Sequence, residues 1–268
     1  MTAQSPHVLS SARSHAWFLW LDRTPRPGWQ NMSLDMSLHA RAARTGRSYL
    51  RFYRWSPSCL SFGRHEPALK RYDTDRIASL GLDTVRRPTG GRAVWHAAEV
   101  TYSVAAPEAA MGSLPEAYQR IHLAIASGLR ALGAPVALAG ARRGVPVDAG
   151  ACFAAAAGGE IVLDTSKVVG SAQLRHGGAV LQHGSVLLDD DQSLMRDITI
   201  GPALPPDVKP LSRILQRRVD WEEVATAIAT AAREWGDQWE GLADDERLLA
   251  ESEPLAAQFR DPAWTWRR

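Results

Sequence analysis

The sequence predicts an α+β protein with a central mixed, largely antiparallel sheet flanked by helices. Segments of strand-like composition come mostly in adjacent pairs, with helical stretches between the groups, whereas a regular alternation would indicate a parallel sheet. Two such segments, 168–174 and 179–188, are separated by Gly177 and Gly178, as in a β-hairpin. Hydrophobic residues make up 45% of the 268 and charged residues 22%, which is ordinary for a well-packed globular protein.

Before residue 113, the sequence predicts five strands and two helices. Runs rich in aromatic and branched residues predict strands at 17–21, 49–55, 59–63, 84–87 and 100–105. A helix should begin at Asn31, whose side chain can cap it, and should end at Gly46. A shorter helix is expected over 73–80, ending at Gly81.

From Ser113 onward, the chain is predicted to contain further helices and three more strands. Ser113 and Glu116 have the spacing of a capping box and begin a helix that Gly133 ends. Strands follow at 161–163, 168–174 and 179–188, and Asp220 begins a helix that ends at Gly236. The remainder is expected to be helical and broken at Pro254.

These elements predict one large domain. We expect a disordered N-terminus over 1–14, a single domain over 15–236, and a helical extension over 237–268 packed on that domain.

Composition excludes several classes of function. A net charge of +2 is too balanced to indicate nucleic-acid binding. No basic stretch precedes an apolar run at the N-terminus, and no run of about 18 apolar residues occurs, so we expect neither a secretory signal nor a membrane partner. Cys59 and Cys152 do not form a disulfide framework, which is consistent with a reducing cytoplasm.

Cys152 and Lys167 are the candidates for covalent chemistry. A thiolate is a strong nucleophile, and a nearby cation lowers the pKa of a thiol. A turn after the segment 160–164 could bring the two side chains together, and the cysteine could then carry an acyl group as a thioester. The residues alone leave two ordinary roles open, a buried cysteine and a solvated lysine. Cys59 lies in an apolar strand, and we expect it in the core.

Two further stretches could bind a ligand. Gly170, Ser171 and Ala172 are small residues in a strand, which suggests close approach of a ligand or another backbone. The loop RRPTGGR at 86–92 pairs two glycines, whose amides could face an anion, with flanking arginines, although a tight turn with solvated arginines is equally possible. Its sequence predicts no nucleotide-binding fold. The spacing of His96 and His183 predicts no metal site and favours structural histidines.

Four stretches together resemble the biotin and lipoate protein ligase superfamily. RRPTGGRAVWHAAEVTYSV looks like its signature, and KVVGSAQ followed by LQHGSVLL is similar to its lipoate branch. NMSLDMSL and RFYRWSPSCLSFGRHE match the opening helix and first strands, so the resemblance covers roughly residues 30–189. It implies the fold of that superfamily's catalytic domain for residues 15–236.

Within the superfamily, the chain looks most like the cysteine-dependent octanoyltransferases of lipoate synthesis. Cys152 and Phe153 occur where that type has its nucleophile. The loop reads GGR where many ATP-dependent lipoate ligases have three glycines, and the chain has no room for their accessory domain. The resemblance implies that Cys152 carries the acyl thioester and that Lys167 lowers its pKa. The segment AAAAGGE after Phe153 departs from relatives, which leaves the preferred chain length open.

The residues and the resemblance together predict the site. The catalytic residues would be Cys152 and Lys167, with no metal and no cofactor. The candidate substrate-binding residues come from the loop at 86–92, from the strand that contains Gly170, and from the two histidines. They are Arg87, Thr89, Gly90, Gly91, Arg92, His96, Gly170, Ser171, Ala172, Gln173 and His183.

The resemblance also implies the reaction and the partners. An octanoyl group would pass from octanoyl acyl carrier protein to a lysine of a lipoyl domain or of glycine cleavage H protein, with the enzyme a monomer. Arg142 and Arg143, ahead of Cys152, would guide these acidic carriers. Two alternatives are an ATP-dependent lipoate ligase, in which Lys167 contacts an acyl-adenylate, and a non-catalytic module that binds carrier domains.

Overall fold

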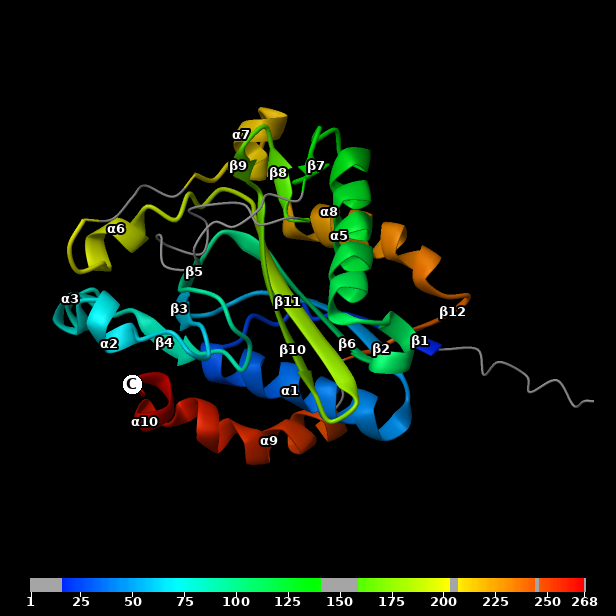
Figure 1. Ribbon diagram of the computed structural model, residues 1–268, viewed down its shortest axis with the longest axis horizontal. Helices are drawn as coiled ribbons and strands as arrows, with labels where there is room; N and C mark the ends of the chain where they lie inside the picture. Colours follow the sequence, from blue (N-terminus) through cyan, green and yellow to red (C-terminus); the bar gives the residue numbers. More distant parts are fainter. Residues whose placement is uncertain (1–15, 141–158, 203–206, 244–245, 268) are drawn as a thin grey trace, which may run out of the picture.

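The computed structural model describes residues 16–140, 159–202, 207–243 and 246–267. Its centre is a six-stranded sheet in the order β10-β11-β6-β2-β1-β12 (Figure 1). The strands are β10 (Val169–His176), β11 (Ala179–Leu187), β6 (Glu99–Pro107), β2 (Ser48–Tyr53), β1 (Ala16–Leu21) and β12 (Gln238–Gly241). The first four pair antiparallel, whereas β1 pairs parallel with both β2 and β12, so the predicted fold class is confirmed.

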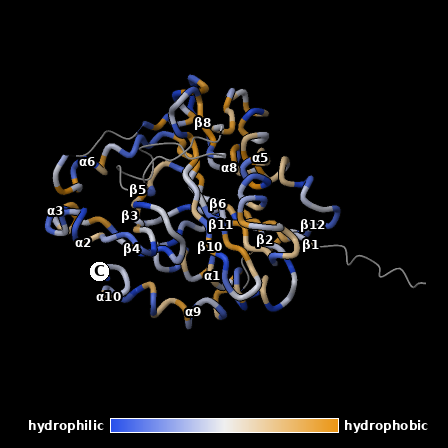
Figure 2. The backbone as a smooth tube through the Cα atoms, in the orientation of Figure 1, coloured by the Kyte–Doolittle hydropathy of each residue, from blue (hydrophilic) through white to orange (hydrophobic). Residues whose placement is uncertain are grey.

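Helices cover both faces of this sheet. On one face lies α1 (Gly28–Thr45), with α9 (Glu246–Arg260) running along it (Figure 1). Leu34 and Leu38 of α1 pack on Tyr49 and Leu181 of the strands. The other face carries α5 (Leu114–Ala131) and α8 (Trp221–Ala231), which bury the largest apolar cluster against the sheet. Polar and apolar residues alternate along α5, as expected of a helix with one buried face (Figure 2).

Two small sheets flank the main one. The first has the order β4 (Asp83–Arg86), β3 (Cys59–Phe62) and β5 (Val94–His96), and it packs against α2 (Ala68–Arg71), α3 (Thr74–Ser79) and α6 (Leu194–Ile198). The second has the order β7 (Ala137–Leu138), β8 (Ile161–Leu163) and β9 (Ser166–Lys167). The remaining elements are α4 (Glu108–Met111), α7 (Leu211–Leu215), η1 (Ala232–Trp235) and α10 (Pro262–Thr265).

Local signals in the sequence located several elements correctly. Gly177 and Gly178 have φ values of 58° and 81°, the left-handed conformation that a two-residue hairpin turn requires. Both hydrogen bonds of the capping box between Ser113 and Glu116 are present. Cys59 is fully buried in β3, as predicted.

Three expectations are wrong. Helix α1 begins at Gly28 after Pro27, and Asn31 does not cap it, because the Asn31 side chain turns inward and donates to the carbonyl oxygens of Arg26 and Arg54. Residues after 236 are not all helical, since β12 pairs with β1. Pro254 does not break α9: it lies on the exposed side, and buried apolar residues before and after it hold the helix against the protein. In the described ranges, no helix is long and apolar enough to cross a membrane.

Candidate active site

A cavity that is partly open to solvent lies on the α1 side of the sheet. Its lining brings together predicted residues from three distant stretches: Arg87, His96, Gly170, Ser171, Ala172 and His183. Met32, Trp55 and Val94, which the predicted site did not include, add apolar surface. A mostly apolar cavity with a few converging polar groups is typical of a binding site for a small molecule.

His183 connects helix α1 to the glycine loop, residues 86–92. Its Nδ1 lies 3.0 Å from Oδ2 of Asp35, and its Nε2 lies 2.6 Å from the hydroxyl of Thr89. Burial lowers the pKa of His183, and the contact with Asp35 opposes this only in part. The neutral ring therefore donates from Nδ1 to the carboxylate and accepts at Nε2 from Thr89.

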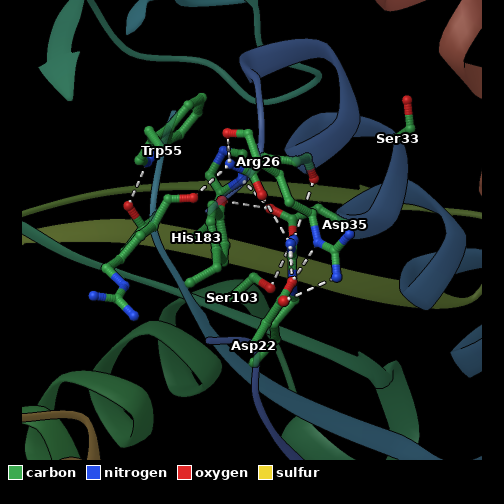
Figure 3. Close-up of polar contacts among 12 residues, drawn as sticks. Asp22, Arg26, Ser33, Asp35, Trp55, Ser103 and His183 are labelled. Atoms are coloured by element: carbon green, nitrogen blue, oxygen red, sulfur yellow. Dashed lines mark hydrogen bonds and ion pairs between the residues drawn. The ribbon is translucent and has the colours of Figure 1, made fainter. Parts of the chain in front are cut away.

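Asp35 is the centre of a buried polar network (Figure 3). Its carboxylate also accepts from Arg51 at 2.9 Å, from Ser103 at 2.9 Å and from Tyr53 at 2.9 Å. Arg51 bridges Asp35 to the Asp22 carboxylate, 2.7 Å away, and both side chains of that second pair are fully buried. Burial opposes ionisation of Asp35, but the hydrogen bond from His183 and the charge of Arg51 outweigh it, so the pKa of this carboxyl lies below its ordinary value.

His96 takes part in a second, similar chain. Its Nδ1 lies 2.7 Å from Oε1 of Glu99, and its Nε2 lies 2.6 Å from Oγ of Ser61, which accepts at 2.6 Å from Arg87. The ring also stacks on Trp55 at 4.1 Å. Hydroxyl, imidazole and carboxylate are arranged as in a hydrolase triad, but Ser61 is fully buried and does not line the cavity. The chain therefore orients Arg87.

Both series of hydrogen bonds, through His183 and through His96, end at residues of the glycine loop. Arg87 itself donates to the carbonyl oxygens of Gly90 at 3.2 Å and Arg92 at 2.8 Å, which closes the loop on its own guanidinium. Gly63 packs directly beneath, because a Cβ there would lie 1.8 Å from the carbonyl oxygen of Gly91. Among the residues that the structure describes, no atom lies within 4 Å of a Cβ built on Gly90. Gly63 therefore restricts the position of the loop at Gly91, and no described residue crowds Gly90.

Arg86 does not contribute charge to the cavity. The side chain is fully buried and donates to backbone carbonyl oxygens of Gly63 at 2.6 Å and Glu66 at 2.8 Å. It also donates to Trp264 at 3.1 Å and Thr265 at 2.9 Å, both in α10. The expectation of a solvated or ligand-facing Arg86 is wrong, since this arginine joins the glycine loop to the C-terminal segment.

Gln173 is not brought to the cavity. Successive side chains of a strand point to opposite faces, and Gln173 lies on the α5 side, where it donates to Gln182 at 2.8 Å and to the Leu114 carbonyl at 3.2 Å. Ser171 lines the cavity, but its hydroxyl also faces the α5 side, within 2.8 Å of His122 and 2.7 Å of Tyr102. The sequence motifs could not separate the two faces of β10.

Lys167 is buried at the start of the same stretch. It is 3% exposed, and its Nζ donates to Oε1 of Glu160 at 2.6 Å. Cys152, Phe153, Arg142 and Arg143 lie outside the described residues, so the pairing of Cys152 with Lys167 stays a prediction, as does the disordered segment 1–14. Over the described ranges, no group of three or more His, Cys, Asp or Glu residues could hold a metal ion.

Comparisons with known proteins identify the family. Residues 27–233 match the family described as lipoyl protein ligase A/B catalytic domain. Octanoyltransferase LipM of an Exiguobacterium species is 32% identical over 94% of this chain and 98% of its own length. The LipM octanoyltransferase of Symbiobacterium thermophilum is 37% identical over 78% of this chain and 82% of its own length.

Solved structures share the fold. A lipoate-protein ligase A bound with ATP has a TM-score of 0.75 at 21% identity, covering 94% of this chain and 98% of that one. A structure described as a bi-partite lipoate protein ligase and its E2 lipoyl domain, from Thermoplasma acidophilum, has a TM-score of 0.72 at 19% identity, covering 94% of this chain and 96% of that one. The resemblance that the motifs indicated is therefore confirmed: the chain belongs to the lipoyl protein ligase A/B catalytic domain family.

Proposed function

We propose that this chain transfers an octanoyl group from acyl carrier protein to a lysine of a lipoyl carrier domain, with a thioester on Cys152 as the intermediate. The observation that carries the octanoyltransferase activity is the match to octanoyltransferases over nearly the whole chain. The donor, an acceptor such as glycine cleavage H protein, and action as a monomer in the cytoplasm complete the proposal.

In the first step, the Cys152 thiolate attacks the carbonyl carbon of the incoming thioester. A new C–S bond forms, the bond to the carrier's sulfur breaks, and that sulfur leaves as a thiolate that takes up a proton. Lys167, whose ammonium is held by Glu160 at 2.6 Å, would favour the thiolate of Cys152. Backbone amides of the glycine loop or near Gly170 would stabilise the oxyanion.

In the second step, the carrier lysine attacks the acyl-enzyme as a neutral amine. An amide forms, the Cys152 thiol is restored, and the amine loses a proton. No ATP is needed, because the thioester is already activated. The octanoyl chain would lie in the cavity against Met32, Trp55 and Val94, where each buried methylene contributes about 0.8 kcal/mol.

The test is intact-mass analysis after mixing the protein with octanoyl acyl carrier protein without ATP. We expect an octanoyl adduct that maps to Cys152, is absent in Cys152→Ala and is retained in Cys59→Ala. Cys59 is a suitable control because burial and the nearby Asp83 raise its thiol pKa well above the ordinary value. Efficient use of free lipoate with ATP by a fully active Cys152→Ala protein would instead establish a ligase.

Lys167 is tested separately. Lys167→Ala should raise the pH midpoint for alkylation of Cys152, because the thiolate loses its cation. An unchanged alkylation profile would show that the lysine has another role, such as contact with an acyl-adenylate.

A further inference from the structure

A second polar network, only part of it buried, lies on the α5 side of the sheet, opposite the cavity. It begins at Gln173 of β10, whose Nε2 donates to Oε1 of Gln182 in β11 at 2.8 Å. Nε2 of Gln182 donates to the hydroxyl of Tyr102 in β6 at 2.9 Å. The Tyr102 hydroxyl lies 2.7 Å from Oγ of Ser171, so three strands are joined side by side.

His122 of α5 is the last side chain of this network. It is fully buried, its Nε2 lies 2.8 Å from Oγ of Ser171, and its Nδ1 lies 2.7 Å from the carbonyl oxygen of Gly159. A carbonyl oxygen only accepts, so Nδ1 carries the proton. Burial lowers the pKa of His122 to about 4, so the ring is neutral and Nε2 accepts from Ser171.

The direction of every hydrogen bond is thereby determined. Because Ser171 donates to His122, its oxygen accepts from Tyr102, whose own oxygen accepts from Gln182. All the bonds run one way, from Gln173 to the carbonyl of Gly159. Both nitrogens of His122 are used inside the protein, which leaves neither for a ligand or for proton transfer to a substrate.

The series of hydrogen bonds ends at the carbonyl of Gly159, directly before Glu160, the residue that binds Lys167. Gly159 has a φ of +84°, a left-handed conformation, and its amide donates to the Ala139 carbonyl at 2.8 Å. The next residue is Glu160, which accepts from Lys167. The position of the Glu160 carboxylate therefore depends on how firmly the Gly159 peptide is held, and α5 holds it through His122.

We propose that His122 is a positioning residue for acyl transfer: its Nδ1 holds the Gly159 carbonyl and thereby sets Glu160 and the Lys167 ammonium. This inference rests on the proposed function, in which Lys167 favours the thiolate of Cys152. It assigns to α5, which carries no residue of the cavity, a share in arranging the reacting groups.

Two amide substitutions separate the two nitrogens of His122. The amide of His122→Asn reaches the position of Nδ1 and can still donate to Gly159, whereas the amide of His122→Gln reaches that of Nε2 and can only keep the bond to Ser171. Tyr102→Phe is the matched control, since it removes two hydrogen bonds of the network, those with Ser171 and Gln182, and leaves the contact between His122 and Gly159.

Steady-state transfer from octanoyl acyl carrier protein and the pH profile of Cys152 alkylation are the measurements. We expect kcat to fall about tenfold in His122→Gln, the effect of one lost hydrogen bond, with KM unchanged and alkylation moved to higher pH. His122→Asn and Tyr102→Phe should stay within about threefold of wild type in kcat. Thermal unfolding confirms that each variant is folded.

Three outcomes are decisive. Equal kcat in the Asn and Gln variants, or an active Gln variant beside an inactive Asn variant, would overturn the positioning role alone. A wild-type protein that forms no octanoyl adduct on Cys152 would remove the proposed function and this inference with it.

Discussion

The buried imidazole of His122 makes a prediction about stability that does not depend on catalysis. Its pKa is about 4 in the folded protein, against 6.5 for an ordinary histidine, because burial disfavours the charged ring. The charge of Lys167 acts in the same direction, while the hydrogen bond to Gly159 opposes it. On acidification, the unfolded chain therefore binds a proton before the folded protein does.

The sign follows from that order. A depressed folded pKa gives stability that is fully present above the unfolded value and is lost as pH falls through the folded value. Integrating the two titrations between pH 7 and pH 5 gives a loss of about 2 kcal/mol in the free energy of unfolding from this one group. Asparagine does not titrate, so His122→Asn lacks this loss.

Urea unfolding at about pH 7 and about pH 5 measures the effect. The free energy of unfolding of the wild type should fall by about 2 kcal/mol more than that of His122→Asn, because all other titrating groups cancel in the difference. Equal pH dependence of the two proteins would mean that the ring titrates normally. It would then be charged or exposed, and the direction of the hydrogen bonds described above would be wrong.

Three further outcomes follow from the cavity and its supports. Asp35→Asn leaves Arg51 and His183 facing a neutral amide, and urea unfolding should show a loss of stability of about 3 to 5 kcal/mol. The control Ser103→Ala removes only a neutral donor to Asp35 and should cost about 1 kcal/mol. Gly63→Ala should displace the glycine loop and lower transfer activity at least tenfold, whereas Gly90→Ala, whose added Cβ meets no atom of the described residues, should unfold like wild type. Deleting residues 262–268 removes carbonyl partners of the Arg86 guanidinium and should lower the thermal midpoint by about 6 °C or more; an unchanged midpoint would show that Arg86 finds other acceptors.

Elements whose signals lie within a few residues could be predicted from the sequence. The capping box at Ser113 and the glycine pair of the hairpin need only local geometry. Strand β12 could not be predicted, because its pairing with β1 joins opposite ends of the chain. The intact helix through Pro254 likewise depends on packing against distant residues.

The candidate site shows the same division. The motifs brought His96 and His183 to attention, but not the carboxylates that orient them. Asp35 could have been suspected, because it is the acidic residue on the buried side of α1, among apolar residues such as Leu34 and Leu38. His122 carried the same signal beside Ile121 and Ile125 in α5. Which partner each charge meets is decided by tertiary structure.

The contact between Arg86 and α10 also has a consequence for the order of events during synthesis. The carbonyl oxygens of Trp264 and Thr265 are 178 and 179 residues further along the chain than the arginine that binds them. At about 5 to 20 residues per second, a ribosome needs roughly 10 to 35 s to add that stretch. For this interval the guanidinium lacks its last acceptors, so a nascent chain cannot complete the support of its glycine loop until the C-terminal helix has emerged.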